Sequence, residues 1–215
     1  MRKVGGTVLF TAVFAVVVTA AALLTVVVLR PRNPGGPPRA EGLPVSVGAG
    51  AGCGDGPCQA LAIQNVNGQT VQLLANSRGD NGRFEAGGDV LEATVTALGA
   101  RLDAKSLSCF PASVSACLIL APRDGGKIAQ LLINRGGSWS SVDKPYFSDA
   151  GVIVLSNVTG GDAPEVVVVQ ASPVLAKVYA LDGSVAGCTR RYSSLGGLRG
   201  WPDVRVTAAD LRPCS

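Results

Sequence analysis

The residues best suited to chemistry in this 215-residue chain are six cysteines, all of which lie after residue 52. They are Cys53, Cys58, Cys109, Cys117, Cys188 and Cys214. Thiols either ligate metals or pair as disulfides, and zinc sites favour CxxC spacings together with histidine. The chain has no CxxC and no histidine, so the even number of cysteines indicates structural disulfides in an oxidising compartment. Six cysteines allow fifteen pairings. Proximity favours 53 with 58, 109 with 117 and 188 with 214, and leaves the others open.

Side chains that could carry out catalysis are few. Without histidine the usual general base at neutral pH is missing, and neither a GxSxG nor a P-loop pattern occurs. Asp143 with Asp149, or Asp162 with Glu165, could act as acid and base as in glycosidases. Neither pair lies among the aromatic residues expected of a sugar cleft. We therefore predict that the protein is not an enzyme and needs no cofactor, with an enzyme of unrecognised class as an alternative.

Aromatic and basic residues near the C-terminus form the clearest candidate binding surface. It comprises Arg190, Arg191, Tyr192 and Trp201. Their charge would suit an anionic wall polymer or lipid headgroups. Trp139 could join this surface by stacking on a sugar, or could instead cap an edge of the core. The tripeptide at residues 78–80 spells Arg-Gly-Asp, a cell-adhesion motif, but three residues occur together by chance too readily to support that function.

Positive charge is concentrated in the first 39 residues. The chain has 19 Lys+Arg and 15 Asp+Glu, and five of the basic residues but none of the acidic ones lie between Met1 and Arg39. Residues 40–215 therefore hold 14 basic and 15 acidic side chains. Because binding to nucleic acid depends on neutralising phosphates with basic side chains, this nearly neutral part predicts no nucleic-acid partner.

An uninterrupted apolar run from Val4 to Leu29 accounts for much of the 47% hydrophobic content. Its 26 residues have basic residues at both ends and are long enough to cross the hydrocarbon core as a tilted helix. A cleaved signal peptide is the alternative, but a cleavable apolar region is shorter, about 7 to 15 residues. We predict an uncleaved signal anchor. Small residues recur every fourth position along it, a spacing through which two anchors could pack as a homodimer. These residues are Thr7, Thr11, Ala15 and Thr19.

The cysteines decide the predicted orientation in the membrane. Basic residues flank the anchor almost equally on both sides, so the positive-inside rule does not choose, whereas disulfides place the residues after the anchor outside the cytoplasm. The predicted organisation has four parts. They are a cytoplasmic stub at 1–3, the transmembrane anchor at 4–29, a Pro/Gly-rich stalk at 30–52 and an extracytoplasmic disulfide-bonded β-domain at 53–215.

Residues 53–215 show the turn signals and short β-branched runs of a β-domain. Three predicted hairpins start near residues 58, 117 and 165. Their turns are Asn67-Gly68, Arg123 to Gly126, and Ser172-Pro173. Residues 91–97 alternate as in a half-buried strand, residues 151–155 predict another, and each hairpin is followed by a glycine-rich stretch that we expect to be irregular. No stretch has the pattern of a capped helix. The predicted fold class is an all-β ectodomain, built either of propeller-like repeated hairpins or as a β-sandwich.

Two short segments are similar to a known repeat. They are NVTGGDAPEVVV at 157–168 and KVYALDG at 177–183. They resemble parts of an FG-GAP or VCBS-type β-propeller repeat, which implies blades with a period near that of the hairpins and a calcium-binding loop. Asn157, Asp162 and Glu165 are the candidate ligands, but Gly161 stands where the family has a carboxylate. Hairpin geometry explains the same residues without a metal, so we predict none. Three repeats are also too few for a closed ring of typically about four blades or more.

The overall composition points to a bacterial envelope. Arginine outnumbers lysine, and alanine, glycine and valine dominate, a bias typical of high-GC bacteria. The whole chain thus resembles a membrane-anchored envelope protein of such bacteria. The predicted function is a single-pass extracytoplasmic interaction module in the cell membrane that binds a protein partner of the envelope. A domain that binds cell-wall glycan or polymer is the alternative.

Overall fold

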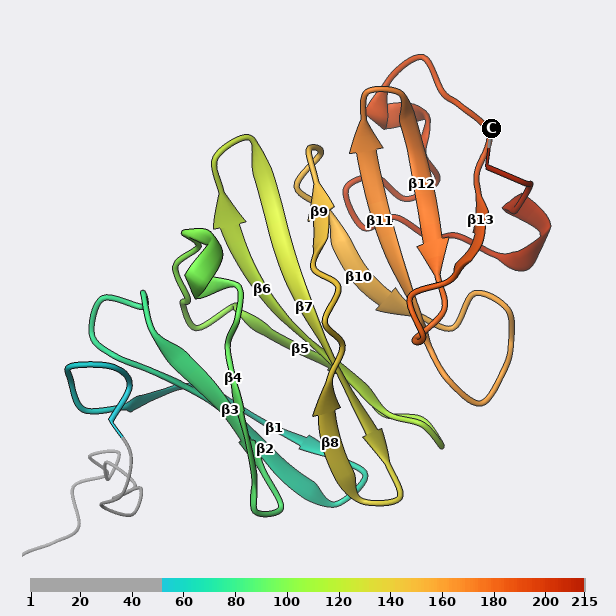
Figure 1. Ribbon diagram of the computed structural model, residues 1–215. Coiled ribbons are helices and arrows are strands. Elements are labelled where there is room, and N and C mark those ends of the chain that lie inside the picture. Colours follow the sequence, from blue (N-terminus) through green and yellow to red (C-terminus); the bar gives the residue numbers. More distant parts are fainter. Residues whose placement is uncertain (1–51, 215) are drawn as a thin grey trace, which may run out of the picture. The chain divides into compact units, whose positions relative to one another are not determined.

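The computed structural model describes residues 52–214, and this part of the chain consists mostly of β-strands (Figure 1). The strands form three antiparallel sheets, each made of strands that are consecutive in the sequence. The all-β prediction is confirmed. The predicted anchor, most of the stalk and the helix-face residues Thr7, Thr11, Ala15 and Thr19 lie outside the described residues. Within residues 52–214, no helix has the length and apolar character needed to cross a bilayer.

The first sheet, sheet I, is a meander of four strands. They are β1 (Gln59–Val66), β2 (Gln69–Ala75), β3 (Gly82–Ala86) and β4 (Asp89–Glu92). The predicted Asn67-Gly68 turn joins β1 to β2. Asn67 has φ 51° and Gly68 has φ 84°, a left-handed conformation that asparagine and glycine accept most readily. The glycine-rich stretch that begins at Gly82 is not irregular, because it pairs with β2 as strand β3.

Sheet II and sheet III repeat this pattern. Sheet II contains β5 (Leu107–Phe110), β6 (Ala116–Arg123), β7 (Gly126–Arg135) and β8 (Ser138–Ser141), and β9 (Tyr146–Ser148) also pairs with β7. Sheet III contains β10 (Ile153–Ser156), β11 (Glu165–Ala171), β12 (Val174–Tyr179) and β13 (Val185–Cys188). The two remaining predicted hairpins are confirmed as β6/β7 and β11/β12. The glycine-rich stretches after them lead into strands β8 and β13, contrary to expectation.

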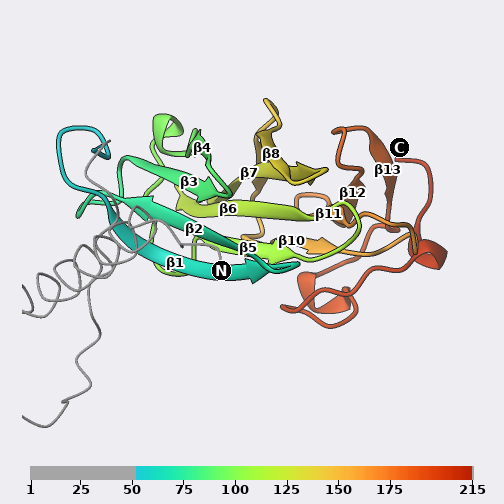
Figure 2. The same ribbon diagram turned by 90° about the horizontal axis from the view of Figure 1, so that it is seen from below.

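Sheet II lies between sheet I and sheet III (Figures 1 and 2). The sheets pack through their faces, with one hydrophobic layer between sheets I and II and another between sheets II and III. Between sheets I and II, Leu73 and Phe84 pack with Ile119 and other residues of sheet II. Between sheets II and III, Leu118 and Leu131 pack with Val166 and its neighbours. Because successive side chains of a strand point to opposite faces, β6 and β7 supply both layers. This double burial explains why their sequences are nearly continuous apolar runs.

The segment that follows β13 covers the outer face of sheet III. Leu198, Val204 and Val206 of this C-terminal segment pack on valines of β11 and β12 to form a third hydrophobic layer. The segment contains two short 3₁₀ helices, η2 (Leu195–Gly197) and η3 (Ala208–Asp210). It ends in a disulfide between Cys188 and Cys214, which ties it back to β13.

The predicted strand at residues 91–97 is wrong beyond Glu92. β4 ends there, and Thr96–Leu98 forms the 3₁₀ helix η1. The Thr94 N–H donates to Oε1 of Gln130 in sheet II, at 2.7 Å, instead of to a neighbouring strand. The alternation of apolar residues is nevertheless real, since Ala93 and Val95 are buried in the layer between sheets I and II.

Candidate binding surfaces

The described cysteines form three disulfides and none is free. The pairs are Cys53–Cys58, Cys109–Cys117 and Cys188–Cys214, the set that proximity favoured among the fifteen. The first lies directly before β1, and the second joins residues that are opposite one another in β5 and β6. The third links the end of β13 to the end of the C-terminal segment. The prediction of structural disulfides is therefore confirmed for this part of the chain.

The outer face of sheet I carries a row of four side chains, one from each strand. Cross-strand pairing aligns Ile63 with Gln72, Gln72 with Glu85, and Glu85 with Val90. The two aliphatic ends of the row are exposed, Ile63 by 54% and Val90 by 58%. Isolated exposed aliphatics are common. Here, however, two of them lie at either end of one row on a sheet face.

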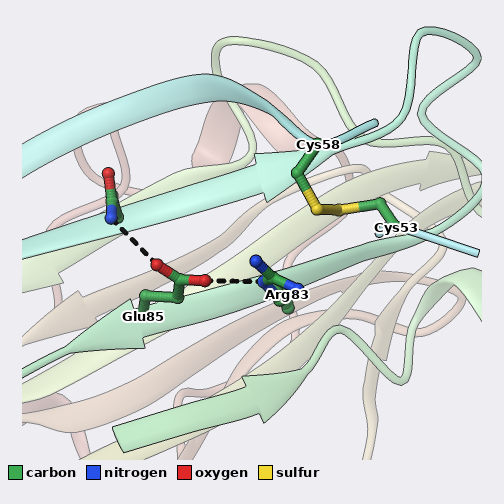
Figure 3. Close-up of polar contacts among 5 residues, drawn as sticks. Cys53, Cys58, Arg83 and Glu85 are labelled. Atoms are coloured by element: carbon green, nitrogen blue, oxygen red, sulfur yellow. Dashed lines mark hydrogen bonds and ion pairs between the residues drawn. A yellow bond between two sulfur atoms is a disulfide. The ribbon is translucent and has the colours of Figure 1, made fainter. Parts of the chain in front are cut away.

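Polar contacts organise the centre of this row. Glu85 accepts a hydrogen bond from the Gln72 amide at 3.0 Å and is paired with Nε of Arg83 at 2.6 Å (Figure 3). The side chains of Arg83 and Glu85 are only 11% and 18% exposed. The charges of Arg83 and Glu85 neutralise one another, so this ion pair does not favour a strongly charged partner.

The predicted surface near the C-terminus lies within the C-terminal segment. The guanidinium of Arg190 lies 4.8 Å from the centre of the Tyr192 ring, a cation–π contact. Arg190 and Arg191 are exposed. Trp201 is half-buried and packs against the third hydrophobic layer, so it contributes to the fold. The structure thus brings Arg190 and Tyr192 together, and it places Trp201 in the same segment mainly as a packing residue.

The C-terminal segment is the most basic part of the described chain. Residues 185–214 carry five exposed arginines against two aspartates. These arginines are Arg190, Arg191, Arg199, Arg205 and Arg212. Hydrogen bonds from Thr207, aided by the charge of Arg199, lower the pKa of Asp210 below its ordinary value. The aspartate therefore caps η3 in its ionised form. Even with both aspartates ionised, the five arginines leave an excess of positive charge in this segment.

Trp139 does not belong to any solvent-facing surface. Its side chain is 4% exposed and lies between sheets I and II, where its ring meets Phe84 edge-on with 5.0 Å between centroids. Its indole N–H donates to Gln69. An aromatic ring so enclosed cannot stack on a sugar, so this part of the predicted binding surface is corrected. Of the two interpretations of Trp139, the structure supports the one in which it caps an edge of the core.

The calcium candidates order the loop before β11. Asn157 accepts a hydrogen bond from the Gly160 N–H and donates one to the Gly161 carbonyl. Glu165 is a buried residue, 6% exposed, and its carboxylate accepts from the Val158 N–H at 2.8 Å and from the Thr159 hydroxyl. Among residues 52–214, no group of three or more metal-binding side chains is arranged around a common point. Asp162 is exposed. The side chains of Asn157 and Glu165 form hydrogen bonds with other residues of their own loop.

The remaining sequence motifs have structural partners. Arg78 and Asp80 of the Arg-Gly-Asp tripeptide pair with one another at 2.8 Å. A hydrogen bond from Asn76, followed by the contact with Arg78, lowers the pKa of Asp80. Asp149 accepts from the Ala171 N–H at 2.6 Å, whereas Asp143 is exposed. The tripeptide is thus engaged within its own turn.

Ser141 and Lys144 have the SxxK spacing of some acyl-transfer enzymes, which was not among the predicted sites. The two side chains are engaged separately. The Ser141 hydroxyl accepts from the Gln130 amide at 2.9 Å. The Lys144 ammonium donates to the Gly183 carbonyl at 3.2 Å and lies over the Tyr179 ring. Nothing in this arrangement makes Lys144 a base for Ser141.

No protein-family model matches the chain, and neither a curated protein nor a solved structure matches it.

Proposed function

We propose that this protein is a membrane-anchored binding module whose β-domain lies outside the cytoplasm and binds a protein partner of the cell envelope. The apolar run from Val4 to Leu29 supports the anchor. The three disulfides support an oxidising compartment. Together they favour a single-pass protein in the cell membrane with its N-terminus in the cytoplasm.

The row on the outer face of sheet I is the observation that carries the proposed protein binding. The opposite end of the stack, sheet III, is covered by the protein's own C-terminal segment through a third hydrophobic layer. On sheet I, by contrast, Ile63 and Val90 are more than half exposed. A partner with an apolar patch would remove both side chains from water, and hydrogen-bonding groups could reach the polar centre of the row.

The finer fold that we propose is an open, propeller-like stack. Each sheet is a meander of consecutive antiparallel strands, and neighbouring sheets pack through their faces, as blades do. The resemblance of residues 157–168 and 177–183 to FG-GAP or VCBS-type repeats favours this over a β-sandwich. With three sheets, the outer faces of sheets I and III do not meet to close a ring. The C-terminal segment covers the face of sheet III, so the face of sheet I is left for a partner.

Site-specific photo-crosslinking in native membranes tests this function. We expect a photoreactive side chain at Ile63 of the full-length protein to give a covalent adduct with one protein. The same group at Val185, an exposed aliphatic residue of sheet III, provides the control. Val90→Lys should remove the Ile63 adduct. Equal adducts at both positions, or an adduct containing only a second copy of this chain, would contradict the proposal.

An anionic cell-wall polymer is the second candidate partner. The five exposed arginines of residues 185–214, one of them stacked on Tyr192, favour it. If this surface is used, the full-length protein in detergent should sediment with purified cell wall, and the bound fraction should fall with added salt. Arg190→Gln with Arg191→Gln should reduce it, while Arg123→Gln with Arg135→Gln in sheet II should not. Equal effects of the two pairs would contradict this candidate.

A further inference from the structure

The β1 edge of sheet I carries backbone groups that are not paired with any described strand. β1 ends the strand order of this sheet, so within residues 52–214 it pairs with β2 alone (Figure 2). The β1–β2 turn has two residues, so the residues that flank it, Val66 and Gln69, form a hydrogen-bonded pair. Hydrogen-bonded and non-hydrogen-bonded pairs alternate along an antiparallel ladder. The register therefore places the N–H and C=O groups of Ile63 and Asn65 on the free edge.

Other sheet edges of the molecule are closed by its own side chains or segments. At β4, the opposite edge of sheet I, the buried Gln130 amide donates to the Glu92 carbonyl at 2.9 Å and accepts from the Thr94 N–H at 2.7 Å. At the β5 edge of sheet II, the Gln64 amide bonds a carbonyl and an N–H of that strand, at 3.0 and 3.1 Å. The C-terminal segment forms a backbone bridge to the β13 edge of sheet III. For the outward groups of Ile63 and Asn65, the described residues offer no such partner.

The composition and exposure of β1 suit pairing with a further strand. Its sequence, QALAIQNV, contains neither a charged residue nor a proline, which are the residues that commonly protect sheet edges. A β-bulge between Ala60 and Ala62 interrupts the ladder, so the regular part of the edge runs from Ala62 to Val66. Ile63 and Asn65, whose backbone groups face outward, are both exposed. An uncharged edge with accessible backbone groups is a template for an added strand.

We propose that the envelope partner binds by adding an extended segment as a β-strand beside β1. This inference rests on the protein-binding function proposed above and specifies how the partner is bound. An extended polypeptide is the ligand whose N–H and C=O groups recur at the spacing of those on Ile63 and Asn65. The added strand lengthens the row on the outer face of sheet I, and its side chain beside Ile63 is aliphatic or aromatic. Because β1 carries no charge, charged residues are not required in the segment that pairs with it.

Removing one outward N–H tests the added strand. Photo-crosslinking from position 63 of the full-length protein in native membranes is compared between Asn65→Pro and Asn65→Ala. Both variants lose the side-chain hydrogen bond to the Gly68 N–H, and only proline also lacks the backbone N–H. That N–H points away from β2, so proline removes no bond of the β1–β2 ladder. We expect Asn65→Pro to give at least about fivefold less adduct than Asn65→Ala, the effect of losing one hydrogen bond.

Hydrogen exchange provides a second readout that does not depend on how the proline variant folds. The adduct formed without a substitution at position 65 is purified, and its amide exchange is compared with that of the uncrosslinked protein. The N–H groups of residues 63 and 65 should exchange at least about fivefold more slowly in the adduct, because the added strand accepts hydrogen bonds from them. The Gln64 N–H, which the ladder already pairs with Val71, is the internal control and should change little.

Two results would overturn the added strand and leave the protein-binding function intact. They are equal adduct yields from correctly folded Asn65→Pro and Asn65→Ala, and unchanged exchange at residues 63 and 65 in the adduct. Either one would show that the partner binds through side chains of the sheet face alone. The absence of any adduct, or an adduct that contains only a second copy of this chain, would overturn both proposals.

Discussion

The indole nitrogen of Trp139 donates a hydrogen bond to Gln69, a residue 70 positions earlier in the chain and in a different sheet. The same indole ring packs edge-on against Phe84 of sheet I. Asp89, at the start of β4, accepts from the Trp139 backbone N–H at 2.7 Å. One residue of β8 therefore fastens sheet II to three strands of sheet I.

We expect Trp139→Phe to lower the free energy of unfolding by about 1 to 3 kcal/mol. It removes the donor to a buried amide oxygen and leaves a small void beside Phe84. Urea unfolding followed by circular dichroism measures the change. Trp201→Phe is the matched control, and its cost should be smaller because Trp201 is only half-buried. Equal losses in the two variants would show that Trp139 has no special role between the sheets.

Gln130 should matter to stability more than an ordinary glutamine. It is 1% exposed and satisfies three groups, the Thr94 N–H, the Glu92 carbonyl and the Ser141 hydroxyl. Gln130→Leu should destabilise the protein by about 1 to 3 kcal/mol in the same assay, because these partners lose their hydrogen bonds. Gln72→Leu, on the outer face of sheet I, should cost less. If Gln72→Leu lowers the free energy of unfolding by as much, our assignment of Gln130 as the residue that ends β4 is wrong.

The Cys188–Cys214 disulfide should stabilise more than the other two. Its loop spans 26 residues, against 5 for Cys53–Cys58. Loop-closure entropy gives about 3.5 kcal/mol for the longer loop and about 2 kcal/mol for the shorter one. Replacing both cysteines of the longer loop by serine should also open the C-terminal segment to trypsin at its exposed arginines. The Cys53→Ser, Cys58→Ser double variant is the control, and cleavage at the same rate in both would contradict the prediction.

Tyr146 should make the protein lose stability at high pH. Burial raises the pKa of its hydroxyl to about 12, and Tyr179 and Asp182 add to the effect. The folded state holds this proton more tightly than the unfolded state, whose pKa is about 10. The resulting stability is therefore complete below pH ~10 and is lost as the pH rises from ~10 through ~12.

Tyr146→Phe isolates that contribution. The hydroxyl is buried and has no hydrogen-bond partner among the described residues, so removing it should leave stability at neutral pH unchanged or slightly higher. Thermal unfolding between pH 9 and 12 should show a shallower decline for the variant than for the wild type. Parallel declines would show that another group is responsible.

Local sequence patterns predicted the hairpins well. Asn67-Gly68, the Arg123 to Gly126 turn and Ser172-Pro173 each join two strands as expected, because a turn and its flanking residues are encoded within a few positions. The predicted strand at 91–97 failed for the opposite reason. Its alternation is local, but the acceptor that ends β4 comes from Gln130, 36 residues away from Thr94.

The candidate sites were predicted less well, because burial depends on what packs against a residue. Nothing around Trp139 in the sequence distinguishes an exposed aromatic from one enclosed between sheets. The contacts that join the β1–β2 turn to sheet II were missed altogether. Their only local sign was the Asn-Gly turn, whereas the hydrogen-bond partners of Asn67 and Gln69 lie about 45 to 70 positions later in the chain.

The sequence by itself determined the all-β class, the three hairpins and the presence of disulfides, since strand alternation, turn residues and cysteine number are local or compositional properties. Only the tertiary structure decided which faces of the strands meet. Sheet II is buried on both sides, sheet III is covered by the C-terminal segment, and sheet I keeps two exposed aliphatic residues, Ile63 and Val90, on its outer face. These outcomes follow from contacts between distant segments, which bury apolar surface wherever two faces are complementary and leave the remaining face to solvent.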